Sequence, residues 1–284
     1  MPLLSWSADR PALRRPVLVV AFDGFVDAGA AASTAALFLR HRWQSEVIGT
    51  FDGDALIDYR ARRPTVVVDR GELRRVDWPV LELCAATVEG AHDVLLLLGP
   101  EPDMRWHVFC SEVAQLCVDL GVETVVGLGA YPAASPHTRP VRVTRAANPL
   151  GLHLAPSASP VPGYTGPIGI ASAMHPVLHS VGIPAVGLWA EVPHYIAASP
   201  NPAAALSLVQ VAAEVVGTEV DTTELQAAAN VHQQQIDDAI AEHPEAAGMV
   251  TALEQHVDSG DDLELATGED IAAEIERFLR MEGN

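Results

Sequence analysis

The stretch from residue 93 to residue 139 most constrains the fold of this chain. Residues 94–99 read Val-Leu-Leu-Leu-Leu-Gly, which is typical of a strand buried on both faces of a parallel sheet. Residues 102–120 repeat apolar side chains at helical spacing, with Pro102 and Asp103 suited to the first turn and Gly121 to the stop. A second apolar strand follows over residues 122–129, and a Pro-rich loop then runs to residue 140. Strand, helix and strand in this order predict a βαβ crossover in an α/β protein.

The same patterns extend the α/β prediction to both sides of this stretch. Pro176 falls inside one predicted helix, where we expect a kink or a break. Asp69-Arg70-Gly71 between two β-rich runs indicates a hairpin. The predicted strands are 16–22, 46–51, 65–68, 72–76, 79–87, 141–146 and 184–192; the predicted helices are an Ala-rich one ending near Arg42, 169–181 and 200–216.

The last quarter of the chain differs in charge from the rest. The sequence has a net charge of −20, and residues 201–284 hold 18 acidic and 2 basic side chains. Acidic helices are predicted over residues 222–243, 245–257 and 269–281. We therefore expect an α/β core over residues 1–217 and an acidic helical extension over residues 218–284, packed on the core or on a neighbouring subunit. Such an acidic surface repels phosphate, which argues against nucleic acid or an anionic membrane as a partner.

Several classes of chemistry are excluded or disfavoured by the residues present. All 17 basic residues are Arg, so Schiff-base enzymes and P-loops with their lysine are excluded. His175 and His179 have a zinc-compatible spacing, but the HExxH motif is missing. The GxGxxG motif is also absent. Because both motifs are missing, we expect no metal and no cofactor. Three Cys without a CxxC pair, no run long enough to span a membrane and no signal-peptide core favour a cytoplasmic protein.

Polar side chains gather where the predicted strands end, which is the edge at which open α/β sheets bind ligands. A catalytic interpretation makes His137 or His194 a general base and Arg139 an anion clamp. The alternative interpretation is a set of caps, turns and ion pairs, and we favour it because structural networks use the same residue types. In addition, Ser33, Ser111 and the Cys residues all lack the setting of a nucleophile. The candidate residues are Asp23, Asp27, Glu101, Asp103, Arg105, His137, Arg139, His194 and Tyr195.

Five short motifs resemble one known family. They are residues 21–29 (AFDGFVDAG), 62–64 (RRP), 98–106 (LGPEPDMRW), 136–140 (PHTRP) and 192–195 (VPHY). Together they resemble the proteasome assembly chaperone family of the second-subunit type, in its actinobacterial branch. The resemblance spans the chain from about Pro16 to Arg280.

This resemblance implies a three-layer α/β/α fold of the phosphorylase/hydrolase-like kind, with a mostly parallel central sheet. It also implies a homo-oligomer, often a trimer, and a chaperone that acts on proteasome α-subunits. Two functions therefore stand at this point. The first, which we favour, is a non-catalytic oligomeric interaction protein. The second is a small-molecule hydrolase or phosphorylase-like enzyme that uses a pocket at the carboxyl ends of the strands.

Overall fold

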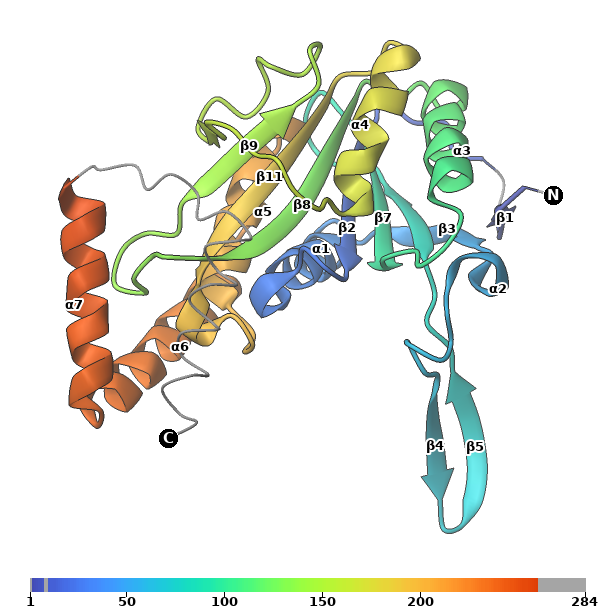
Figure 1. Cartoon of the computed structure of the whole chain (residues 1–284). Helices are drawn as coiled ribbons and strands as arrows, with labels where there is room; N and C mark the ends of the chain where they lie inside the picture. Colours follow the sequence, from blue (N-terminus) through green and yellow to red (C-terminus); the bar gives the residue numbers. More distant parts are fainter. Residues whose placement is uncertain (1, 8–9, 260–284) are drawn as a thin grey trace.

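A nine-stranded sheet forms the centre of the molecule in the computed structural model, which describes residues 2–7 and 10–259 (Figure 1). The strand order is β1-β3-β6-β7-β2-β8-β11-β9-β10. The strands are β1 (Leu4–Trp6), β2 (Val17–Asp23), β3 (Glu46–Phe51), β6 (Glu82–Ala86), β7 (Val94–Pro100), β8 (Thr124–Ala133), β9 (Val143–Ala147), β10 (Ser159–Pro160) and β11 (Ala185–Pro193).

The sheet is mixed, with a parallel centre as expected and antiparallel pairs toward its edges. Its four central strands, β7, β2, β8 and β11, run parallel to one another. The pairs β1–β3, β3–β6, β6–β7 and β11–β9 are antiparallel. The link from β6 to β7 is too short to hold a crossover helix, so these neighbouring strands can only run antiparallel. Apolar runs indicate that a strand is buried but not its direction.

Helices cover both faces of the sheet, which confirms the three-layer α/β/α prediction. The side chains of β2 alternate between two apolar cores, with Val19 in one and Leu18 in the other. On one side lie α1 (Ala31–Arg42) and α5 (Pro202–Val216), and on the other lie α3 (Trp106–Asp119) and α4 (Ile170–Ser180). The small Ala side chains of α1 are fully buried, which lets this helix lie close to the strands.

Two of the predicted acidic helices are present beyond the core. They are α6 (Thr223–Ala241) and α7 (Pro244–Ser259), and α6 buries Leu225 and Ala229 against the core that contains α5. The predicted helix over residues 269–281 lies outside the described residues. None of the helices between residues 10 and 259 combines the length and the apolar content that a membrane span requires.

The predicted hairpin is confirmed and stands apart from the sheet. Strands β4 (Thr65–Asp69) and β5 (Glu72–Asp77) pair only with each other, and every residue in them is exposed. Arg70 and Gly71 occupy left-handed backbone conformations in the turn, with φ of 51° and 81°. Figure 1 shows the hairpin extending from the body of the molecule.

Two helix predictions need correction. The helix expected to start at Pro102 begins at Trp106, after Arg105 with φ of 59°, because residues 101–105 form a loop whose carboxylates bind distant backbone amides. Of the kink or break expected at Pro176, the break is wrong, because α4 runs through this residue. The proline removes one internal hydrogen bond there, while Met174 and Leu178 stay buried in the core.

Short helical turns complete the edge of the sheet. They are α2 (Gly53–Leu56) and the 3₁₀ turns η1 (Ala28–Ala30) and η2 (His194–Ile196). The turns η1 and η2 follow the carboxyl ends of β2 and β11, so they position Asp27, His194 and Tyr195.

Candidate functional site

The loop after β8 places His137 in a nearly closed environment. Its side chain is 4% exposed. The hydroxyl of Tyr195 lies 2.8 Å from the backbone nitrogen of His137, which donates to it, and 2.7 Å from Nδ1. Because the hydroxyl oxygen accepts the amide hydrogen, its own hydrogen is free to go to Nδ1. That leaves Nε2–H to donate to Oδ1 of Asp237 on α6, at 3.0 Å.

Arg139 makes the next connection, to α7. Its guanidinium donates to both carboxylate oxygens of Asp258, at 3.0 and 2.7 Å, and to Glu254 at 3.2 Å. The hydrogen bonds from Arg139 hold the pKa of Asp258 below its usual value. Thr138 also donates to Glu254. We call residues 137–139 the clamp, because they join the loop after β8 to both acidic helices.

Asp23 and Asp103 form a separate group around Arg62. Nη1 of Arg62 lies 3.1 Å from Oδ2 of Asp23, and Nε lies 4.0 Å from Oδ1 of Asp103. The backbone amide of Asp58 donates to Asp103 at 2.8 Å. Arg62 lies just before the hairpin, so these contacts attach the base of the hairpin to the carboxyl edge of the sheet.

Glu101 and Asp27 bind the backbone amides of other segments. Glu101 is buried and accepts from the amides of Ile170, at 2.7 Å, and Phe25, at 3.1 Å. A Cβ at Gly24 would lie 2.5 Å from Oε2 of Glu101, so this approach requires glycine. Glu101 therefore links the loop after β2 to the first residue of α4.

Asp27 precedes the turn η1, and its carboxylate reaches past this turn to the first turn of α1, whose N-cap position is Ala30. Oδ1 of Asp27 accepts from the amides of Ala32, at 2.7 Å, and Ser33, at 3.2 Å. Burial raises the pKa of Asp27, although these hydrogen bonds oppose the rise.

The two remaining candidates have no shared centre. Arg105 is exposed before α3. His194 is exposed, and its Nδ1 donates to the carbonyl oxygen of Ala133 at 3.3 Å while its ring meets that of Tyr195 edge-on at 5.4 Å.

The structure thus places the predicted residues in separate groups and not around one pocket. His137, Arg139, His194 and Tyr195 lie toward α6 and α7, whereas Asp23 and Asp103 share Arg62. Among the described residues, no hydrogen bond or ion pair joins these two groups. The functional partners that sequence reasoning missed are Arg62, Asp237, Glu254 and Asp258. These partners are about 100 residues or more from the clamp in sequence, so no local motif could pair them with it. Only the fold brings them together.

An apolar groove lies beside the clamp. It has a volume of about 950 Å³ and is lined by α6, the start of α7 and the segment after β11. Its lining includes Tyr195, Val231, Ile236, Ile240 and Met249 but no carboxylate or Arg. We call it the α6 groove.

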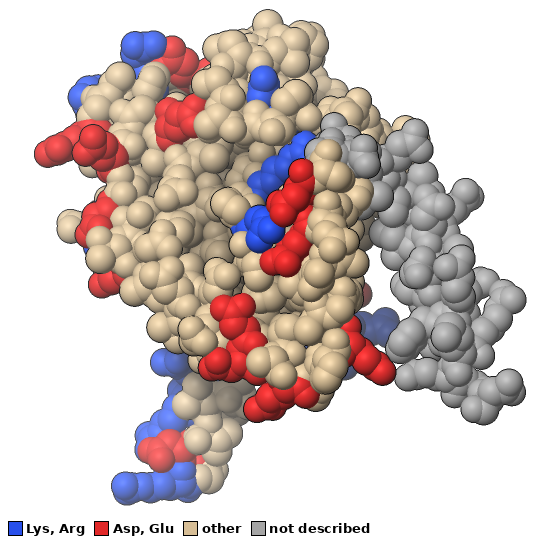
Figure 2. All heavy atoms as spheres, turned by 90° about the vertical axis from the view of Figure 1, so that its left-hand side faces the viewer, with Lys and Arg blue, Asp and Glu red and all other residues tan. Residues whose placement is uncertain are grey.

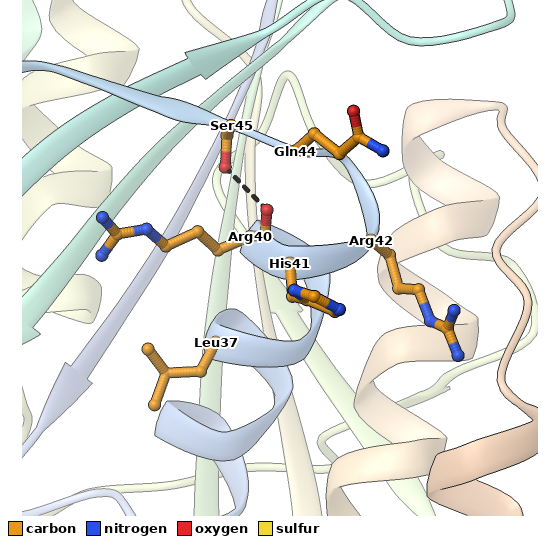
Figure 3. Close-up of a pocket in the computed structure, with 6 residues that line it drawn as sticks. All are labelled: Leu37, Arg40, His41, Arg42, Gln44 and Ser45. Atoms are coloured by element: carbon orange, nitrogen blue, oxygen red, sulfur yellow. Dashed lines mark hydrogen bonds between the residues drawn. The ribbon is translucent and has the colours of Figure 1, made fainter.

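A second hollow lies at the end of α1, with a volume of about 660 Å³ (Figure 3). Its two Arg side chains point away from each other in Figure 3. Arg40 pairs with Glu82, and Arg42 pairs with Glu224. The hollow therefore lacks a set of convergent polar groups of the kind a catalytic centre needs.

The cysteine thiols and His175 are poorly suited to catalysis at neutral pH. Burial raises the pKa of Cys84 and of Cys110 to about 11 and that of Cys117 to about 12, so all three remain protonated. Burial lowers the pKa of His175 to about 4, so its imidazole is neutral.

Comparison with known proteins identifies the family. Residues 21–240 match the model of the PAC2 family. A Mycobacterium tuberculosis proteasome-assembly chaperone homologue is 38% identical, with a TM-score of 0.75, over 82% of this chain and 99% of that one. A PAC2 family protein from Streptomyces avermitilis is 38% identical, with a TM-score of 0.73, over 83% of this chain and 99% of that one.

A protein of unknown function from Corynebacterium glutamicum is 32% identical, with a TM-score of 0.82, over 91% of this chain and 98% of that one. An archaeal proteasome activator from Pyrococcus furiosus, with 15% identity and a TM-score of 0.63, shares the fold. No curated protein matches. The family model covers most of the sequence and the mycobacterial and Streptomyces relatives extend over more than four fifths of it, so this chain belongs to the PAC2 family.

Proposed function

We propose that this protein is a non-catalytic, oligomeric assembly chaperone that acts through its surface, with proteasome α-subunits as its partner. The observation that carries the proposal is the 38% identity, over 82% of this chain, to the mycobacterial proteasome-assembly chaperone homologue. The proteasome as partner is taken from the name of that relative, and the choice of its α-subunits follows from the family that the sequence motifs resemble.

The geometry of the strand-end residues supports a non-catalytic role. A general base must reach a substrate proton, but His137 is 4% exposed and has Tyr195 and Asp237 on its two ring nitrogens. Arg139, the candidate anion clamp, is already paired with two carboxylates. The hydrolase alternative therefore has less support, because His137 and Arg139 are used to hold α6 and α7. His194, the other proposed base, is exposed and its Nδ1 is hydrogen-bonded to the carbonyl oxygen of Ala133.

We further propose a homo-oligomer, with a trimer favoured, in the cytoplasm. Exposed apolar side chains on the hairpin and in the α6 groove support self-association. Buried thiols with raised pKa values suit a reducing compartment. In this proposal residues 1–217 are the core and residues 218–284 are an extension that supplies interaction surface.

An assembly assay tests the function. Purified proteasome α-subunits from the same source would be mixed with this protein, and the yield of α-subunit rings would be followed by size-exclusion chromatography. The proposal predicts a yield several-fold different from that with an unrelated protein of equal net charge. Ring formation that is the same with both proteins would contradict it.

A further inference from the structure

The hairpin presents an apolar face that no helix or strand within residues 10–259 covers. In its register Val66 lies opposite Val76, and Val68 lies opposite Leu73. Side chains opposite each other in an antiparallel pair point to the same face, as do residues two apart along a strand. The register shifts between Val67 and Val68, which leaves Arg74 without an opposite residue and brings Leu73 and Val76 to the same face although they are three residues apart. The four side chains are 52%, 41%, 57% and 60% exposed in that order. They form one continuous apolar surface, which we call the hairpin face.

The base of the hairpin is held firmly, so this face is presented in a defined position. Arg62, in the segment that leads into β4, forms an ion pair with Asp23, and its Nε lies 4.0 Å from Oδ1 of Asp103. On the two sides of the hairpin base, the rings of Tyr59 and Trp78 meet edge-on at 4.8 Å. A two-stranded hairpin is marginally stable in water by itself, and its exposed edges favour pairing with other chains. These features fit an arm that is covered by a partner.

The α6 groove is a second apolar surface that the described part of the chain leaves open. Val231 in its lining is 60% exposed, and the lining as a whole is mainly apolar. Its volume of about 950 Å³ is large enough to accept several aliphatic side chains at once.

The charges around the two surfaces are complementary. Residues 60–77, which include the hairpin, contain six Arg and three acidic residues in a chain with a net charge of −20. Residues 218–259, which include α6 and α7, contain nine acidic residues and neither Lys nor Arg. Glu242 and Glu245 are adjacent in sequence to His243 and Ala246, which line the groove. Figure 2 shows acidic side chains gathered along the lower edge of this side of the molecule and basic side chains on the arm that extends below it.

From these observations we propose that the hairpin face of one copy docks in the α6 groove of a second copy of this chain. In Figure 1 the hairpin and α6 lie on opposite sides of the molecule, so a hairpin cannot reach the groove of its own chain. The contact joins two different surfaces and is therefore heterologous, which permits a closed ring of copies. This inference rests on the oligomeric part of the proposed function and names its interface.

The test uses two variants of the full chain and one control. Val68→Asp with Leu73→Asp places charge on the hairpin face, and Val231→Asp places charge in the α6 groove. Leu152→Asp is the control, because Leu152 is 62% exposed in a loop outside both surfaces. Circular dichroism melting verifies that each variant remains folded. Native mass spectrometry then gives the number of chains in each assembly.

We expect an oligomer for the wild type and for Leu152→Asp, and a single chain for each of the other variants at the same concentration. An equimolar mixture of the hairpin variant and the groove variant should form a 1:1 dimer. In that mixture the intact hairpin of the groove variant meets the intact groove of the hairpin variant, and no further chain can be added.

Three results would overturn the inference: a monomeric wild type, a groove variant that keeps the wild-type assembly, or a mixture of two monomeric variants that forms no dimer. If the groove variant stays oligomeric while the hairpin variant dissociates, hairpins pair with each other instead. An oligomer that behaves as expected but leaves α-subunit assembly unchanged would remove the proposed chaperone function and leave this interface intact.

Discussion

Nε2 of His137 lies 3.0 Å from Oδ1 of Asp237, a residue 100 positions later in the chain. This contact joins the loop after β8 to α6, and the neighbouring Arg139 joins the same loop to α7. The clamp therefore explains why His137 and Arg139 occur at the carboxyl edge of the sheet without any need for catalysis.

Replacing His137 tests this structural role. His137→Ala should lower the apparent free energy of unfolding by about 1–3 kcal/mol, because it removes the imidazole that is hydrogen-bonded to the Tyr195 hydroxyl and to the Asp237 carboxylate. Urea denaturation at fixed protein concentration measures the change. His153→Ala, at an exposed position in the loop after β9, is the control and should change stability little. Equal stability of the two variants would contradict the clamp.

Removing Arg139 should act locally. We expect Arg139→Ala to increase amide hydrogen exchange in α7 (Pro244–Ser259) while β2 remains as protected as in the wild type. The reason is that α7 loses its ion pairs with the loop, whereas the central sheet loses none. Arg10→Ala removes an exposed ion pair with Asp119 and provides the comparison. An unchanged exchange rate in α7 would show that Arg139 does not hold this helix.

Glu101 should contribute to stability rather than to chemistry. Glu101→Ala removes the acceptor of two backbone amides, those of Phe25 and Ile170, in a buried position. We expect a loss of about 2–4 kcal/mol in the free energy of unfolding. Glu89→Ala, at an exposed position, should change little by the same measurement. A Glu101→Ala variant as stable as wild type would refute this assignment.

His175 should make stability depend on pH. The pKa of His175 in the folded protein is lowered from its ordinary value of 6.5 to about 4, because burial disfavours the charged imidazolium. Between these two values the unfolded chain binds a proton that the folded chain does not, so stability falls as pH decreases. By pH 5 the loss attributable to His175 should be roughly 1–2 kcal/mol relative to pH 8.

The matched variants are His175→Gln and His179→Gln, one helical turn apart on α4. Urea denaturation at pH 8 and pH 5 should show a smaller pH dependence for His175→Gln than for the wild type. His179→Gln, at an exposed position, should keep the wild-type dependence. Equal dependence in all three proteins would rule out a buried neutral His175.

Local sequence patterns predicted most of the elements, for identifiable reasons. The strand expected over residues 46–51 is β3, Glu46–Phe51, and the Asp69-Arg70-Gly71 turn is found where its residues indicate. These features depend on apolar patterning and on backbone preferences that act within a few residues.

The errors arose where distant segments override local signals. Pro102 and Asp103 have the character of a first helical turn, but the Asp103 carboxylate accepts the amide of Asp58 and the helix begins at Trp106. The partners of the candidate site residues were missed for the same reason. Its residues lie at the ends of the expected strands, but their partners Asp237, Glu254 and Arg62 come from segments that no local spacing connects to them.

The central claim is a direct interaction with proteasome α-subunits, and native mass spectrometry of the wild-type protein tests it most directly. The protein would be measured alone and then after mixing with α-subunits from the same source, with an unrelated acidic protein as the control. The proposed function predicts a discrete mass that contains both this chain and α-subunits and that is absent from the control mixture. Spectra that contain only the separate masses of this protein and of the α-subunits would contradict it.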